Sequence, residues 1–340
     1  MVHEKTDRAW VEIVFLSLSS VLLYQFAIGL FVFLFPLQVL YKRRGQRFFL
    51  IALALTFGIL AAVRSFRPFL GAEFGTASVF IFIEMFIIAC LMGGLALVNL
   101  WRPDLGSVVK LIGATAATGL LSVPLIARMA RDGAFIENID SMFSAMSVYL
   151  QNAISQNSMA QSPLLLEAFQ PQTLKLLATD LLYKSYLFNY FIILTFGWWA
   201  GSITGAKSTR SGSGVTKLSE FKLKDHYLWF FIGAWALVLI TSLAGVAMPG
   251  ALTALAWNAA LLLLFLYGLQ GIGIARFLMN KYHLSRGWRV ISLAMLAILL
   301  LTPRINIVMF FLIPGIGISE MWIRYRKPER NSSDESDPQQ

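Results

Sequence analysis

The sequence predicts an all-α protein, a polytopic transmembrane helical bundle of about 8–10 spans with an amphipathic helical insertion on its outer side. Apolar residues make up 57% of the 340 residues and charged residues only 14%, whereas a soluble domain carries about 25% charged residues. The apolar residues collect in runs close to the roughly 20 residues that a helix needs to cross the hydrocarbon core. Regular alternation of apolar and polar residues, which a membrane β-barrel requires, is absent.

The predicted spans follow one another at residues 11–41, 48–63, 76–100, 108–129, 186–203, 228–246, 251–278, 290–301 and 305–322. The first run exceeds one upright span, barely allows two, and contains Gln25, Gly29 and Pro36. It predicts either a short helix pair or one long broken helix. A cleaved signal peptide is the competing interpretation, but Glu4 and Asp7 precede the run and the run is too long.

The distribution of Lys and Arg predicts the orientation. Most of the 28 basic residues fall in groups near 42–47, 102–110, 207–224, 276–289 and 324–330. The opposite side of the alternating topology keeps Arg64, Arg67, Arg128, Arg131, Lys175, Lys184 and Arg304. Because cytoplasmic loops are enriched in Lys and Arg, both ends of the chain are expected in the cytoplasm. This topology needs an even number of crossings: ten result if the first run is a helix pair, whereas nine would put the N-terminus outside.

The chain is predicted to form one transmembrane domain over residues 1–330, followed by a disordered cytoplasmic tail at 331–340. The outer insertion covers 131–184, and a Gly/Ser/Thr-rich cytoplasmic linker covers 204–226. Apolar residues recur at three- and four-residue steps in the insertion, at Ile136, Ile139, Phe143, Met146, Leu150 and Ile154. This spacing predicts two or three amphipathic helices that cap the bundle or lie on the outer surface. Recognition of a partner or substrate is the alternative role.

Glu84 is the leading candidate for a functional side chain because it lies about eight residues inside an apolar span. Its proposed partner is Arg304. The helix that precedes Arg304 is short, about 20 Å long, so both charges are expected to face one cavity in the outer half of the membrane. The alternative is a structural Glu84, neutral or hydrogen-bonded between helices.

Three amides complete the set of tentative ligand-binding residues: Asn189, Asn258 and Gln270 lie inside apolar runs. Amides between membrane helices also act as hydrogen-bonding contacts that hold the helices together, so both interpretations remain open. Gly201 and Gly205 have the spacing that permits close helix packing.

Several classes of function find no support. Cys90 is the single cysteine, and His3, His226 and His283 lie far apart, so no disulfide or metal site is expected. The net charge of +10 reflects residues that flank apolar runs, which argues for membrane orientation and against nucleic acid. The segment 201–208 departs from a phosphate-binding loop in its spacing. No nucleophile, His and acid set is visible, so neither an enzyme nor a bound cofactor is expected.

The C-terminal half contains Asn189–Tyr190, EFKLKD at 220–225, LQGIGIARFLMNK at 269–281 and GIGISEMWIRYRK at 315–327, in that order. This arrangement resembles the YybS-like family of predicted bacterial polytopic membrane proteins, a domain of unknown function. In the last motif Glu320 stands where the family pattern has Asp. The resemblance implies a bacterial inner (cytoplasmic) membrane and an architecture similar to the substrate-binding components of energy-coupling-factor transporters.

The features together favour a substrate-binding or transport component for a small molecule. The alternative is a non-transporting scaffold that recruits protein partners through the linker or the insertion. Beyond the lipid bilayer, the expected partners are a small-molecule substrate and separate energising or scaffold subunits, since the chain contains no recognisable ATPase.

Overall fold

The computed structural model describes residues 2–66, 74–102, 104–156, 167–209, 217–243 and 248–326. Within these ranges the chain is helical and contains no strand. It divides into two compact units, Met1–Val215 and Thr216–Gln340. Unit 1 contains α1 (Val2–Gln25), η1 (Ala27–Phe31), α2 (Leu34–Arg44), α3 (Gln46–Phe66), α4 (Phe74–Leu100), α5 (Ser107–Met129), α6 (Gly133–Gln156) and α8 (Pro171–Thr209). Unit 2 contains η3 (Leu218–Glu220), α9 (His226–Leu243), α10 (Gly250–Lys281), α11 (Arg286–Leu301) and α12 (Ile305–Ser319).

Six helices are long and apolar enough to cross a membrane: α3, α4, α5, α8, α9 and α10. Many of their side chains, including Leu120, Leu243 and Leu255, are apolar and exposed on the protein surface. A lipid-facing helix has this property because hydrocarbon replaces the missing protein contacts. The prediction of an all-helical, multi-span membrane protein is therefore confirmed.

One helix differs from its predicted extent. The sequence suggested a span over 186–203 preceded by separate surface helices, but α8 is one continuous helix of 39 residues. At 1.5 Å per residue it is about 58 Å long, roughly twice the hydrocarbon thickness. No glycine or proline interrupts it between Gln172 and Phe196, so nothing in the sequence ends the helix where the span begins.

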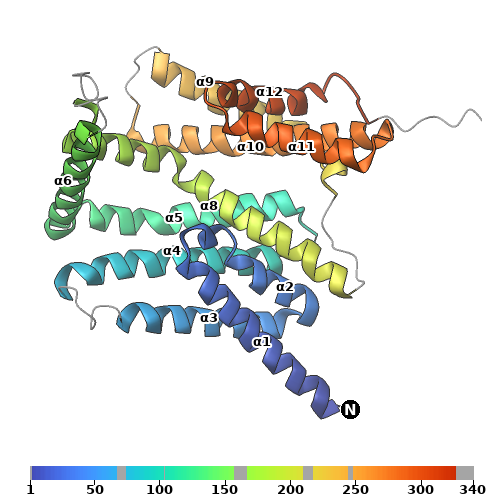
Figure 1. Cartoon of the computed structure of the whole chain (residues 1–340), viewed down its shortest axis with the longest axis horizontal. Helices are drawn as coiled ribbons and strands as arrows, with labels where there is room; N and C mark the ends of the chain where they lie inside the picture. The colour runs from blue at the N-terminus through green and yellow to red at the C-terminus, as the bar shows by residue number, and fades with distance from the viewer. Residues whose placement is uncertain are drawn as a thin grey trace, which may run out of the picture. The chain divides into compact units, whose positions relative to one another are not determined.

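Unit 1 has two distinct ends. Figure 1 shows α3, α4 and α5 lying side by side and α6 lying crosswise at the end where α4 begins and α5 finishes. Phe80 of α4 contacts Phe135 of α6 with ring centroids 5.8 Å apart, and Lys175 of α8 pairs with Asp140 at 2.5 Å. We call this the cap end. The opposite, basic end carries Lys42, Arg43, Arg44, Arg47, Arg102, Lys110 and Lys207.

The first apolar run forms a hairpin of two short helices, α1 and α2, joined by η1 (Figure 1). Glu12 of α1 pairs with Arg43 at 3.0 Å and with Arg44 at 2.7 Å, which holds the two arms together at their base. From this base α1 continues for about 20 Å, and the 11 residues of α2 return over about 16 Å. Measured from this base, neither arm reaches the roughly 30 Å of the hydrocarbon core, and the hairpin is not among the helices that are long and apolar enough to cross it.

The hairpin packs on α8 through three glycines spaced four residues apart. A β-carbon at Gly197 would lie 2.7 Å from Leu34 Cβ, and one at Gly201 would lie 2.5 Å from Gln38 Cβ. At Gly205 it would lie 2.6 Å from Lys42 Cβ. Any side chain on this face of α8 would therefore push α2 away, and the spacing matches the small-residue pattern of close membrane helices.

Unit 2 repeats this close approach. In α10 and α12, β-carbons at Gly271 and Gly317 would collide with the carbonyl oxygens of Ile313 and Tyr267. Helices α11 and α12 have 16 and 15 residues, about 24 and 22 Å, so they form a second short hairpin. Arg304 lies at its turn, in the left-handed region at φ 71°.

Candidate functional site

A partly buried ion pair joins two of the long apolar helices of unit 1. Arg64 Nη2 of α3 lies 2.6 Å from Glu84 Oε1 of α4, and the two side chains are only 12% and 29% exposed. Tyr24 Oη donates a hydrogen bond to the same carboxylate oxygen at 2.9 Å. The Arg64 guanidinium also lies over the Tyr24 ring, 5.6 Å from its centroid. We call Tyr24, Arg64 and Glu84 the ion-pair triad.

The triad explains how a carboxylate is tolerated inside an apolar helix. An isolated charge in hydrocarbon costs several kcal/mol, and the charges found there are paired with one another. The phenol of Tyr24 supplies a second donor to Glu84, which further compensates for lost water. Arg64 Nε is buried and has no hydrogen-bond partner among the described residues. Within the described ranges the triad therefore contains one N–H donor that has no acceptor.

The three residues come from elements of different kinds. Arg64 lies in the last turn of α3, and Glu84 lies inside α4. Tyr24 lies in the last turn of α1, immediately before η1 breaks the hairpin. The tip of the short hairpin thus contacts two of the helices that are long and apolar enough to cross a membrane.

The structure gives Glu84 a different partner from the one predicted. The sequence suggested Arg304, which belongs to unit 2 and is exposed at the α11–α12 turn. Within unit 1 the ion pair is made with Arg64, and the predicted pairing of Glu84 with Arg304 stays a prediction. Sequence analysis placed Arg64 just outside a span that ended at residue 63, but α3 continues to Phe66 and keeps Arg64 on the helix. Tyr24 was missed because a tyrosine in an apolar run carries no distinctive signal.

Two of the three predicted amides bond within their own helix. Asn189 is exposed on α8 and donates to Ser185 Oγ at 3.2 Å. Asn258 is buried on α10 and donates to the carbonyl of Ala254 at 2.8 Å. Their predicted roles in ligand binding stay predictions.

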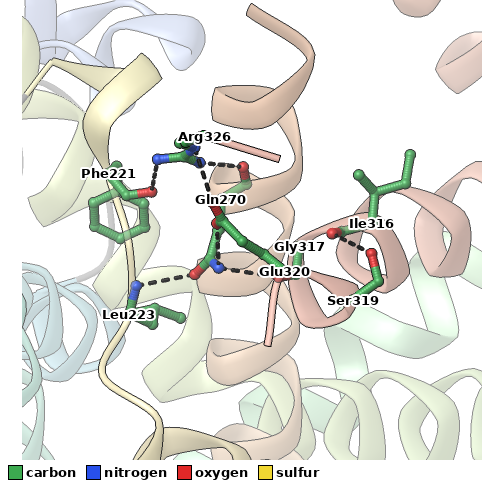
Figure 2. A network of polar contacts seen from close by, with 8 residues as sticks. All are labelled: Phe221, Leu223, Gln270, Ile316, Gly317, Ser319, Glu320 and Arg326. Carbon is green, nitrogen blue, oxygen red and sulfur yellow. Dashed lines mark hydrogen bonds and ion pairs between the residues drawn. The ribbon is translucent and has the colours of Figure 1, made fainter. Parts of the chain in front are cut away.

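Gln270, the third amide, is the centre of a buried polar network in unit 2 (Figure 2). Its Oε1 accepts a hydrogen bond from the backbone N–H of Leu223 at 2.9 Å. Its Nε2 donates to the carbonyl of Gly317 at 3.0 Å and to Glu320 Oε2 at 2.9 Å. One side chain thereby fastens a non-helical part of the predicted linker to α10 and to the end of α12.

The same network contains the residues of the last sequence motif. Arg326 Nε lies 3.1 Å from Glu320 Oε1, and Glu320 is 4% exposed. Arg326 also donates to the carbonyl of Phe221 at 2.9 Å and to that of Gln270 at 3.3 Å (Figure 2). Burial lowers the pKa of Arg326, and the Glu320 carboxylate opposes this change. Because every acceptor around Arg326 is a backbone carbonyl or a carboxylate, the arrangement is suited to holding the chain in place.

Unit 1 has its own buried amide, Gln38, which sequence analysis did not single out. Gln38 Nε2 donates to Ser202 Oγ at 2.8 Å and to Asn99 Oδ1 at 3.2 Å. Asn99 Nδ2 returns a hydrogen bond to Gln38 Oε1 at 2.6 Å. These side chains connect α2, α4 and α8 near the basic end, and their mutual bonds account for their burial.

No group of three or more His, Cys, Asp or Glu side chains that could hold a metal ion occurs in the described ranges.

Comparison of the chain with protein families, with curated proteins and with solved structures finds no match. The assignment therefore rests on the helices themselves. The chain is a multi-span integral membrane protein.

Proposed function

We propose that this membrane protein is a binding or transport component for a small polar solute, and that the ion-pair triad is part of its solute site. The observation that carries the proposal is the Arg64–Glu84 ion pair between two spanning helices, 2.6 Å long and hydrogen-bonded to Tyr24. Charged residues inside membrane helices are typical of solute and ion pathways. Arg64 Nε is buried and has no acceptor among the described residues, so a polar solute that opens the triad finds a donor there.

The short hairpin supports the same proposal. Membrane transporters commonly place their sites where helices are interrupted within the bilayer, because the broken backbone offers polar groups there. Tyr24 stands at such an interruption, one residue before α1 ends. A solute that displaces the Tyr24 hydroxyl from Glu84 would alter the contact between the hairpin tip and the α3–α4 pair. Solute binding and hairpin position would then be coupled.

The distribution of charge in unit 1 supports an orientation with the basic end in the cytoplasm. Six spans are an even number of crossings, and each short hairpin leaves the membrane on the side where it enters. The chain therefore begins and ends on the same side, the cytoplasm. In this orientation the triad lies in the outer half of the bundle.

The chain contains no recognisable nucleotide-binding loop, so transport driven by ATP would need separate energising subunits. The resemblance to the YybS-like family is consistent with this proposal and with a bacterial inner membrane, and it stays a prediction.

The test is a thermal-shift screen of the purified protein in detergent against vitamins, nucleosides, amino acids and inorganic ions. The screen is repeated on Glu84→Gln, which removes the charge at nearly constant size. Glu12→Gln is the matched control, because Glu12 also belongs to an ion pair of unit 1 but lies at the hairpin base. A solute at 100 times its Kd raises stability by about 2.7 kcal/mol, which a melting curve detects.

The proposal predicts a solute that stabilises the wild type and Glu12→Gln but not Glu84→Gln. A solute that stabilises all three proteins equally would place its site elsewhere. If a well-folded protein responds to no solute, the proposal fails and the second candidate becomes the better one.

The second candidate is a scaffold that recruits a protein partner through the cap. One observation favours it: α6 exposes Met142, Met146 and Tyr149, which lie three or four residues apart on one side of the helix. The predicted linker is less suited to this role, because Phe221 and Leu223 are fastened into unit 2. A partner that copurifies with the wild type and is lost on replacing the three cap residues by serine, with the melting temperature unchanged, would support the scaffold.

A further inference from the structure

The cap end of α5 carries a basic pocket that is separate from the ion-pair triad. The pocket has a volume of about 540 Å³ and is lined by Pro124, Ala127, Arg128, Arg131 and Asp132. Both arginine side chains are exposed, and neither has an ion-pair or hydrogen-bond partner among the described residues. Two guanidinium groups that face one pocket without partners form a site for an anion with several oxygens, since a guanidinium binds phosphate through paired N–H groups.

A single carboxylate modifies the charge of this pocket. Asp132 Oδ1 accepts a hydrogen bond from the backbone N–H of Phe135 at 3.1 Å and so caps the start of α6. Its second oxygen makes no hydrogen bond to another described residue. The pocket therefore presents two cations and one anion, a pattern that matches a ligand carrying a phosphate and a nearby amine. For a ligand with negative charge alone, Asp132 opposes part of the attraction of the two arginines.

The pocket continues into an apolar surface. Leu120 lies one turn before Pro124 on the same face of α5 and is 76% exposed, and the neighbouring Val123 is 60% exposed. Helix α5 has 23 residues, about 34 Å, which brings its last turn to the level of the lipid headgroups when the helix spans the bilayer. An acyl chain can lie along Leu120 and Val123 while its headgroup occupies the pocket.

We propose that the pocket formed by Arg128, Arg131 and Asp132 binds the headgroup of a phospholipid that pairs a phosphate with a primary amine. The two arginines hold the phosphate oxygens, and Asp132 holds the ammonium group. A free phosphoamine shares this headgroup chemistry but not the apolar contact with Leu120 and Val123. The apolar surface therefore favours the lipid.

The experiment is native mass spectrometry of the whole purified protein in detergent, titrated with four probes. The probes are dihexanoyl phosphatidylethanolamine, dihexanoyl phosphatidylglycerol, O-phosphoethanolamine and inorganic phosphate. We expect the ethanolamine lipid to bind most tightly. The double variant Arg128→Ala/Arg131→Ala should weaken this binding by about tenfold or more, since each arginine supplies a charge-assisted contact. Lysine at both positions should restore part of it, because the charge returns without the paired geometry.

Two further variants sharpen the assignment. Asp132→Asn keeps a residue that caps a helix well and removes the charge, so it should lower the preference for the ethanolamine lipid over the glycerol lipid. The matched control is Arg47→Ala/Arg102→Ala, which removes two exposed arginines from the basic end and should leave binding unchanged. A melting curve for each variant shows whether it is folded.

Three outcomes would overturn the proposal. O-phosphoethanolamine binding as tightly as the lipid would identify the ligand as a soluble phosphoamine. An equal loss in the control would show that binding depends on overall charge. Absence of binding by any probe to the folded wild type would show that the pocket is not a headgroup site.

Discussion

In each unit a helix too short to cross a membrane packs against a much longer one. In unit 1 the 11 residues of α2 pack on the 39 residues of α8, and in unit 2 the 15 residues of α12 pack on the 32 residues of α10. Both contacts depend on glycines that admit no β-carbon, at Gly201 in α8 and at Gly271 and Gly317 in unit 2. Both also place one buried glutamine at the contact, Gln38 or Gln270.

The two glutamines differ in what they bond. Gln38 is bonded to the side chains of Asn99 and Ser202, which can rotate toward other acceptors if Gln38 is lost. Gln270 is bonded to the backbone of Leu223 and Gly317 and to Glu320, whose other carboxylate oxygen pairs with Arg326. The Leu223 N–H cannot reach a new partner without a movement of the chain. The comparison indicates that the contribution of a buried amide to the free energy of unfolding depends on whether its hydrogen-bond partners can reorient toward other groups.

The largest expected effect comes from Gln270→Leu. This change leaves the buried Leu223 N–H without a partner and removes the amide hydrogen bond from Glu320, which keeps its ion pair with Arg326. A buried group left unsatisfied costs about 1–3 kcal/mol, and a hydrogen bond to a charged group contributes about 1.5–3 kcal/mol. We expect the free energy of unfolding to fall by about 3–5 kcal/mol. Gln38→Leu should cost only about 1–2 kcal/mol.

Unfolding in mixed micelles with increasing SDS, followed by tryptophan fluorescence, measures both changes. Equal decreases in the free energy of unfolding for Gln270→Leu and Gln38→Leu would contradict this distinction. They would show that backbone and side-chain partners find replacement hydrogen bonds equally well.

Gly317→Ala is expected to lower the free energy of unfolding by an intermediate amount, and it tests the close contact between α10 and α12. Its new methyl group would collide with the Tyr267 carbonyl, and crowding of this kind costs about 1–3 kcal/mol. Gly315→Ala is the matched control two residues away, where a β-carbon has no neighbour within 4 Å. The control should be neutral or stabilising by up to about 1 kcal/mol, since alanine favours helices more than glycine does. The same SDS titration reports both, and a neutral Gly317→Ala would contradict close packing of α10 and α12.

The smallest effect is expected at the base of the unit 1 hairpin. Glu12 and its partners Arg43 and Arg44 are 19–35% exposed, and ion pairs with access to water contribute about 0–1 kcal/mol. Glu12→Gln should therefore lower the free energy of unfolding by less than about 1 kcal/mol, and high salt should shrink the difference further. A loss of several kcal/mol that salt does not change would mean that the hairpin base lies in a dry environment.

The sequence allowed the helices to be predicted well because each depends on local properties. Helices α3, α4, α5, α9 and α10 begin within two residues of the predicted spans. The length and composition of an apolar run decide whether a helix can cross hydrocarbon, and both can be read directly from the residues. The continuous helix α8 departs from prediction for the same local reason, since no residue in it ends the helix before Gly197.

The sequence predicted some of the polar residues of the candidate sites but not the partners that they bind. Glu84 was identified from its charge and position alone, but its ion pair with Arg64 was not predicted. Gln270 was identified as a buried amide, whereas Gln38 was not, because it lies near the end of the ambiguous first run. The role of Glu320 and Arg326 as partners of Gln270 could not be inferred either, since nearly 50 residues separate Gln270 from Glu320 in the chain.

The sequence by itself determined that this is a helical membrane protein, where its long spans lie, and which end of each is basic. Burial of a helix in hydrocarbon depends on its own length and composition, so no other part of the chain is needed to establish these features. The tertiary structure decided that the first run is a hairpin and that Tyr24, Arg64 and Glu84 meet. Such meetings depend on the depth of each helix and its rotation about its own axis. Packing between helices sets both, and residue spacing within one helix does not.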